Sequence, residues 1–170
     1  MKKNSPHNSK LKKIKNQIYA VDLFCGVGGL TNGLEAAGIK VLKGYDNDES
    51  VEYAYSKNNK AQFQLQDINE LKGKEIKKLF ENAPQTLIAG CAPCQPFSIY
   101  QKKKDKNSIK THKKYPAFIN FIRIVKEVKP DFVTMENVPS IKKDDNFIDF
   151  VNKLKEMKYK VNFKVINIAN

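Results

Sequence analysis

Two cysteines with two residues between them, Cys91 and Cys94, stand in the stretch GCAPCQPFS and could do several kinds of chemistry. Such a pair can bind a metal, cycle between thiol and disulfide, or fill a core, and either thiol can act as a nucleophile. A metal would need further ligands, and neither the two histidines nor Cys25 stands at ligand spacing. A redox pair should open a helix, which Pro93 and Pro96 disfavour. We therefore expect no metal and no redox centre.

The two prolines instead favour a stiff loop that fixes the direction of one exposed thiol. Cys91 follows the apolar run TLIAG directly, so we expect it to be a buried packing residue. Cys94 lies between the prolines and is the better candidate for a nucleophile.

A carboxylate, Glu136, follows another apolar run in the stretch MENVP. A carboxyl group at the end of a buried strand is partly desolvated, so it can keep its proton and serve as a general acid. Taken alone, the simpler interpretation is a surface acid before a turn. The catalytic interpretation gains force only if Glu136 lies beside Cys94.

A glycine-rich turn in DLFCGVGGL, residues 22–30, indicates a ligand site when it is combined with acids further along the chain. Asp46 and Asp48 suit ribose hydroxyls, and Asp67 can accept a hydrogen bond from an adenine amine. The glycine spacing differs from the dinucleotide fingerprint and lacks the lysine of a P-loop. The pattern favours an adenosine-type cofactor, with S-adenosylmethionine and NAD both open. The alternative is an ordinary tight turn followed by surface acids.

Short apolar runs that alternate with amphipathic segments would position these residues. We expect strands at residues 18–24, 39–45, 62–66, 86–90, 131–135 and 161–168, and helices at 29–37, 49–58, 69–82, 117–128 and around 147–154. This alternation predicts an α/β, Rossmann-like fold: an open, mostly parallel sheet with helices on both faces. Ligands bind at the carboxyl ends of such strands, where the polar clusters fall.

The charge of the chain points to a polyanionic partner. Its 170 residues carry a formal net charge of +13, which makes nucleic acid the expected partner. Lysine enrichment can also reflect an AT-rich genome. The length predicts one domain, residues 17–170, behind a disordered basic tail at residues 1–16.

The compartment can be inferred from two further features of composition. No apolar run approaches the ~20 residues that span a bilayer, and no signal peptide is recognisable, so we expect no membrane. Three cysteines, an odd number without framework spacing, favour a reducing, cytoplasmic location.

The ordered series DLFCGVGGL, YDND, QDI, GCAPCQPFS and MENVPSI resembles the motif series of the cytosine-5 DNA methyltransferases, from about Tyr19 to the last residue. The resemblance implies an S-adenosylmethionine-dependent methyltransferase fold, S-adenosylmethionine as cofactor and DNA as substrate. It implies that Cys94 is the nucleophile and that Glu136 helps to protonate the target cytosine. It suggests a place in a bacterial restriction–modification system.

The same resemblance implies roles for further residues. Those for the cofactor are Phe24, Gly26, Gly28, Gly29, Asp46 (where the family usually has glutamate) and Asp67. Ser98 and the lysines Lys102, Lys103 and Lys104 belong to a loop that would close over DNA, although this stretch could also be a solvated linker. Ala92 stands where a proline is common.

Part of the family's motif series is not present in these residues. The glutamine-arginine-arginine motif, the target-recognition domain and two later motifs are absent. We therefore expect a catalytic half completed by a second polypeptide, or a truncated product. The alternatives are a non-catalytic scaffold that binds nucleic acid by charge and, within the enzymes, a tRNA methyltransferase.

Overall fold

The computed structural model of the chain describes residues 17–93 and 116–167. Its elements are β1 (Ile18–Leu23), α2 (Gly29–Ala36), β2 (Lys40–Asp46), η1 (Glu49–Val51), α3 (Glu52–Asn58), β3 (Gln62–Leu65), α4 (Gly73–Leu79), β4 (Gln85–Gly90), α5 (Pro116–Val128), β5 (Phe132–Met135), η4 (Pro139–Lys143) and α6 (Asp145–Glu156). The expected basic tail, residues 1–16, lies outside the described residues.

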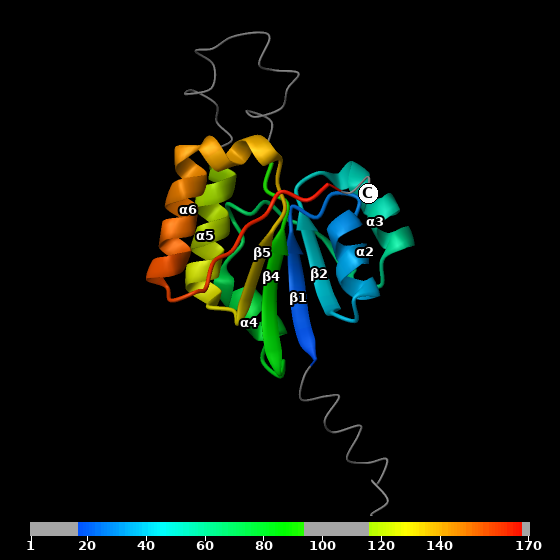
Figure 1. Cartoon of the computed structure of the whole chain (residues 1–170). Coiled ribbons are helices and arrows are strands. Elements are labelled where there is room, and N and C mark those ends of the chain that lie inside the picture. The colour runs from blue at the N-terminus through cyan, green and yellow to red at the C-terminus, as the bar shows by residue number, and fades with distance from the viewer. Residues whose placement is uncertain (1–16, 94–115, 168–170) are drawn as a thin grey trace, which may run out of the picture.

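The five strands of the described ranges form one parallel sheet in the order β3-β2-β1-β4-β5 (Figure 1). In the register of β1, Leu23 pairs with Tyr45 of β2 and with Gly90 of β4, so the three carboxyl ends are level. Strand order reverses between β1 and β4, which is where α/β sheets bind ligands. The Rossmann-like fold expected from the sequence is confirmed.

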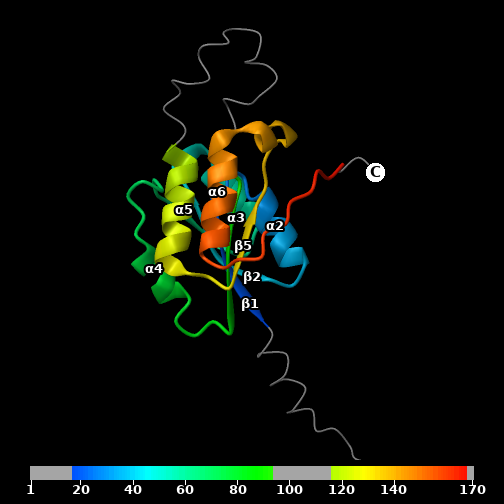
Figure 2. The same ribbon diagram turned by 60° about the vertical axis from the view of Figure 1, so that its left-hand side comes forward.

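Successive residues of β1 point to opposite faces of the sheet and into two separate cores. Val21 and Leu23 pack in a cluster with residues of α4, α5 and α6, whereas Ala20 packs with Tyr55 of α3 and with the apolar side of α2. Figures 1 and 2 show these two helical layers on either side of the sheet. All four of these residues are buried, because β1 is covered on both faces.

Two of the expected helices are shorter than the pattern suggested. The expected helix at 69–82 begins only at Gly73, because the Asp67 carboxylate accepts the backbone N–H of Asn69 at 2.8 Å and so forms a turn. The expected helix at 49–58 divides into η1 and α3. Apolar periodicity locates a helix, but capping side chains decide where it begins.

The expected last strand at 161–168 is wrong for its described part, since residues 161–167 form no strand. In the described residues the sheet ends at β5, so this segment does not pair as a further strand. The expectation that β5 is buried is also wrong, because Phe132 is 44% exposed. In the described part of the sheet, β5 is an edge strand.

Replacing Gly90 by alanine should destabilise the domain, because β4 passes close to its neighbours there. A Cβ atom would lie 2.7 Å from the carbonyl oxygen of Leu23 and 2.7 Å from Cε2 of Phe121. We expect Gly90→Ala to lower the free energy of unfolding by about 1 to 3 kcal/mol, measured by chemical denaturation.

Gly33→Ala is the matched control, since a Cβ in this exposed position of α2 would meet nothing within 4 Å. It should raise the free energy of unfolding by roughly 0.5 to 1 kcal/mol. Equal effects of the two substitutions would contradict the close approach at Gly90.

Candidate active site

The turn after β1 has a backbone that few residues can adopt. Gly26 and Gly28 have positive φ angles of 50° and 89°. A Cβ on Gly28 would lie 2.0 Å from Nδ2 of Asn59 and 2.8 Å from Cδ2 of Tyr55, so no side chain fits. Phe24 has φ 59° without being glycine. Such strained residues cluster at ligand sites.

Asp46, at the end of β2, holds this turn in place. Its Oδ2 atom accepts the backbone N–H of Gly26 at 2.8 Å, and its Oδ1 atom accepts that of Asp48 at 3.1 Å. Its carbonyl oxygen accepts the N–H of Gln66 after β3, at 2.7 Å. One residue therefore joins the ends of three strands, and its carboxylate oxygens keep lone pairs for hydroxyl donors.

A cavity of about 380 Å³ lies over the ends of these strands. Phe24, Asp46 and Asp67, expected to bind the cofactor, all line it, and Gly26, Gly28 and Gly29 shape the turn beside it without lining it. Pro93, Pro116 and Ala117 line the same cavity. An aromatic ring with carboxylates at two strand ends fits an adenosine-type ligand, and the volume lies in the usual range for such sites.

A buried polar group under the turn was missed by the sequence analysis. Asp22 is fully buried inside β1, where its Oδ2 atom accepts a hydrogen bond from the Thr31 hydroxyl at 2.7 Å. The Thr31 oxygen lies 3.2 Å from that of Tyr55. Within the described residues the Oδ1 atom of Asp22 has no partner. A charged residue inside an otherwise apolar strand is the signal that could have revealed it.

Burial controls the protonation of this region. It raises the pKa of Asp22 from its ordinary 3.8 to about 6, against the lowering effect of the Thr31 hydrogen bonds. Burial, with the nearby Asp22 and Asp46 carboxylates, also raises the pKa of the Cys25 thiol. Cys25 therefore stays a protonated, unreactive thiol at neutral pH.

The start of the cysteine loop lies against the residues that follow β5. The backbone N–H of Glu136 donates to the carbonyl oxygen of Gly90 at 3.1 Å, and Nδ2 of Asn137 donates to that of Ala92 at 2.9 Å. The Cys91 thiol donates to Oε2 of Glu136 at 3.0 Å. The structure thus brings the GCAP and MEN segments together at one sheet edge.

Two expectations about these residues are wrong. Cys91 is partly exposed and contacts Glu136, because the end of β4 leaves its side chain at the sheet edge instead of in a core. Glu136 is exposed and not half-desolvated, because β5 is an edge strand with one open side. Cys94, Ser98, Lys102, Lys103 and Lys104 lie outside the described residues.

Residues 17–93 and 116–167 show neither a metal site nor a membrane-spanning helix. In these ranges no three His, Cys, Asp or Glu side chains gather as a metal site would require. No helix there is both long enough and apolar enough to cross a bilayer.

Comparison with known proteins relates this geometry to a family. The model of the C-5 cytosine-specific DNA methylases matches residues 18–170. The chain belongs to this family. The type II methylase M.HgiDII of Herpetosiphon aurantiacus is 41% identical over 150 residues, which cover 86% of this chain and 41% of that protein. The type II methyltransferase M.HhaI of Haemophilus parahaemolyticus is 32% identical, with 86% and 42% covered.

Solved structures agree with the fold of this methylase domain. A prophage-encoded protein of E. coli, described as a DNA modification methyltransferase, matches with a TM-score of 0.63 and 27% identity over 82% of this chain and 38% of its own. The Dnmt2 methyltransferase of S. pombe matches with a TM-score of 0.63 at 20% identity, covering 83% and 41%. The chain spans about two-fifths of the length of the curated relatives M.HgiDII and M.HhaI.

The raised pKa of Asp22 predicts how stability depends on pH. Because the folded domain holds this proton to about pH 6 and the unfolded chain releases it near 3.8, stability is lost as pH rises through this window. Relative to Asp22→Asn, the free energy of unfolding of the wild type should fall by about 2 to 3 kcal/mol between pH 4 and pH 7.

Urea denaturation of both proteins across this range measures the difference, in which the titration of all other groups cancels. A difference that does not change with pH would contradict the assignment.

Proposed function

We propose that this methylase domain is the catalytic part of a DNA (cytosine-5) methyltransferase. The observation that carries the proposal is the position of Pro93. Pro93 lines the cavity of about 380 Å³ described above. Just before it, the carbonyl oxygen of Gly90 accepts the backbone N–H of Glu136, and that of Ala92 accepts Nδ2 of Asn137. Cys94 is covalently bonded to Pro93, so the proposed nucleophile follows a residue fixed between cofactor cavity and glutamate.

The cofactor we propose is S-adenosylmethionine, which supplies an electrophilic methyl group when bound. Asp46 would accept hydrogen bonds from the ribose hydroxyls, and Asp67 would accept one from the adenine amine. Phe24 would lie against the adenine ring. Gly26, Gly28 and Gly29 let the backbone come close to the ligand. The family membership of the chain supports this choice over NAD.

The chemistry requires activation of a poor carbon nucleophile. The thiolate of Cys94 adds to C6 of cytosine, and the electron pair moves toward N3, where protonation assisted by Glu136 stabilises the developing charge. C5 then attacks the methyl group, and loss of the C5 proton expels Cys94. Because Glu136 is exposed and its Oε2 atom is taken by Cys91, Oε1 is the oxygen we assign to the base.

The substrate we propose is DNA with its target cytosine turned out of the duplex, because neither the thiol nor the carboxylate can reach a stacked base. The net charge of +13 supports phosphate contacts, which we assign to Ser98, Lys102, Lys103 and Lys104. Such an enzyme works in the cytoplasm, as part of a restriction–modification system like those implied by the names of its type II relatives.

We also propose that a second polypeptide supplies the remaining part of the fold. The relatives M.HgiDII and M.HhaI extend over more than twice the length matched by this domain. A groove of about 340 Å³ between β5, α6 and residues 159–163 is bordered by Phe132, Val133 and Phe163. Edge strands with exposed apolar side chains pair readily with a further strand.

Covalent trapping tests the nucleophile. Once a methyl group has been transferred from S-adenosylmethionine to a 5-fluorocytosine at the target, C5 has no proton to lose, so the adduct with Cys94 cannot break down. The wild type, with its complementing chain, should form a band stable in denaturing electrophoresis, and Cys94→Ser should abolish it.

Cys91→Ser is the matched control and should keep trapping, because the hydroxyl can donate to Glu136 as the thiol does. An adduct that persists in Cys94→Ser would refute the assignment. Trapping on tRNA instead of DNA would favour a tRNA methyltransferase. Binding of S-adenosylmethionine without any trapping would favour a non-catalytic scaffold.

Complementation tests the second polypeptide. The part of M.HgiDII beyond its match to this chain serves as the probe, mixed with this domain and assayed for tritium transfer to DNA. Transfer should require both parts. Phe132→Glu should lower it at least about tenfold by placing a charge in an apolar contact, whereas Tyr53→Glu, which alters an aromatic residue that is 76% exposed on α3, should not.

Two results together would contradict a separate partner at this edge. One is a single chain that contains both parts and has the same methyl-transfer activity, and the other is a mixture whose methyl transfer does not change in Phe132→Glu.

A further inference from the structure

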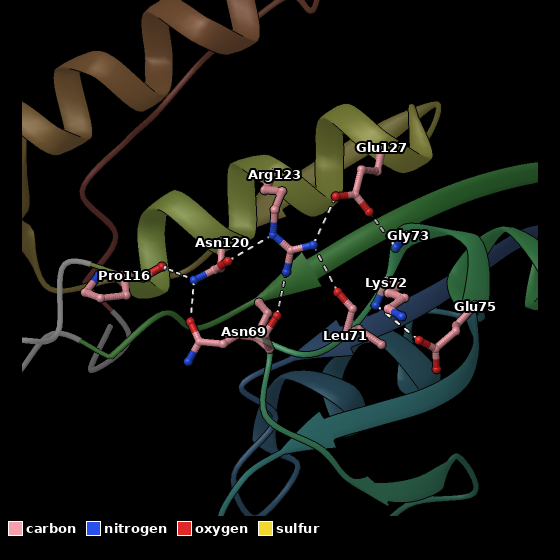
Figure 3. Close-up of polar contacts among 10 residues, drawn as sticks. Asn69, Leu71, Lys72, Gly73, Glu75, Pro116, Asn120, Arg123 and Glu127 are labelled. Atoms are coloured by element: carbon pink, nitrogen blue, oxygen red, sulfur yellow. Dashed lines mark hydrogen bonds and ion pairs between the residues drawn. The ribbon is translucent and has the colours of Figure 1, made fainter.

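Arg123, the only arginine among the 31 lysine and arginine residues, holds a loop of its own domain. From α5 its Nη2 atom donates to the carbonyl oxygen of Ile68 at 2.7 Å, and Nη1 donates to that of Leu71 at 3.0 Å. Both acceptors lie in the segment between β3 and α4 (Figure 3). A planar guanidinium can reach two such carbonyls at once, which a lysine cannot do with the same geometry.

Two neighbours on the same face of α5 hold the same segment. Nδ2 of Asn120 donates to Oδ1 of Asn69 at 2.5 Å, and Oε2 of Glu127 accepts the N–H of Gly73 at 2.7 Å. A Cβ on Gly73 would lie 2.5 Å from Cβ of Glu127, so only glycine allows this approach. The segment is therefore fixed to α5 by side chains on three helical turns (Figure 3).

In the series of hydrogen bonds from Arg123 to the cavity, the donor and the acceptor of each bond are fixed. A guanidinium has donors and no acceptor, so the Asn120 atom that meets Nε of Arg123, at 2.9 Å, must be Oδ1. Asn120 then presents Nδ2 to Asn69, and Asn69 must turn Oδ1 toward it. The Nδ2 atom of Asn69 is left to donate to Oδ1 of Asp67, at 2.7 Å. Arg123 thus fixes the orientation of both amides together with the carbonyl oxygen of Pro116, which also accepts Nδ2 of Asn120, at 2.9 Å.

The end of this chain of hydrogen bonds is a residue of the cofactor cavity. Asp67 lines the cavity, and Oδ1 receives both the backbone N–H and Nδ2 of Asn69. Oδ1 is thereby occupied, and Oδ2 is the oxygen that remains for a donor from a ligand. The carboxylate can turn about its χ2 angle only at the loss of two hydrogen bonds.

The ion pair between Arg123 and Glu127 does not by itself account for the arrangement. Its side chains are 32% and 41% exposed, and partly exposed pairs at this helical spacing contribute little to stability. The loop is already anchored by Ile68 and Leu71, which are buried in the core. The guanidinium adds a fixed direction for its N–H donors. Through Asn120 and Asn69 this direction affects the Asp67 carboxylate.

We propose that Arg123 is a positioning residue for the cofactor, acting through Asn120 and Asn69 to aim the Asp67 carboxylate at the 6-amino group of adenine. The proposal rests on the proposed function, because it takes Asp67 as the adenine ligand. Arg123 does not line the cavity, yet by this proposal it influences which base of the ligand the cavity prefers. The consequence is a preference for ligands with an amine donor over ligands with a carbonyl there.

Two product analogues measure this preference directly. S-adenosylhomocysteine carries the amine, and S-inosylhomocysteine carries a carbonyl oxygen in its place. Calorimetry on the intact chain gives both dissociation constants. The wild type should prefer the adenosyl compound by about tenfold or more, since a hydrogen bond to a carboxylate is among the stronger ones.

Asn120→Asp is the decisive variant, because it keeps an acceptor for Arg123 but removes the Nδ2 donor that Asn120 presents to Asn69 and to the carbonyl oxygen of Pro116. Arg123→Gln removes the charge and the fixed direction together. In both, the preference should fall toward one, chiefly through weaker binding of the adenosyl compound. Lys126→Gln is the matched control, since it removes the same charge from an exposed position of α5 and should leave the preference unchanged.

Each outcome decides one question. An unchanged preference in Asn120→Asp and Arg123→Gln, with only a lower melting temperature, would overturn the positioning role and leave a structural contact. A wild type that binds both analogues equally would overturn the role of Asp67 while leaving the methyltransferase proposal. A wild type that binds neither would overturn both.

Discussion

The burial of β1 is the constraint on which the rest of the domain depends. It is hydrogen-bonded along both edges and covered by helices on both faces, so its carboxyl end is fixed in three dimensions. The strained turn at Phe24 can exist only because this strand and Asp46 hold both of its sides. Asp22 shows the strength of the constraint, since it remains in the strand although burial disfavours its charge.

The cavity next to this strand has walls from both halves of the sheet. Asp46 connects the ends of β1, β2 and β3 on one side, and Arg123 connects α5 to the segment after β3 on the other. Pro93 and Pro116, which flank residues 94–115 in the sequence, both line the cavity. The residues that border this stretch therefore line the same cavity as the residues assigned to the cofactor.

Much of this arrangement could be predicted from the sequence, and the failures have a common cause. Apolar runs located five strands and the helices, because alternation of burial is a local property of the chain. The sixth strand, the burial of β5 and the desolvation of Glu136 were wrong, because each depends on what lies beside an edge. A run such as DFVTM has the same composition in a central strand and in an edge strand. Cys91 was misassigned because it lies just beyond the last residue of β4, where the apolar run no longer decides burial.

The sequence by itself determined the order of motifs, the class of fold and the chemistry that Cys94 and Glu136 could perform, because residue type and spacing are set along the chain. Only the tertiary structure decided which atoms meet: Cys91 with Glu136, Asp22 with Thr31, and Arg123 with the loop that leads to Asp67. These pairs are 45, 9 and 55 residues apart, measured for the last from Ile68. Hydrogen bonds depend on distance and direction in space, and no local pattern specifies either across such separations.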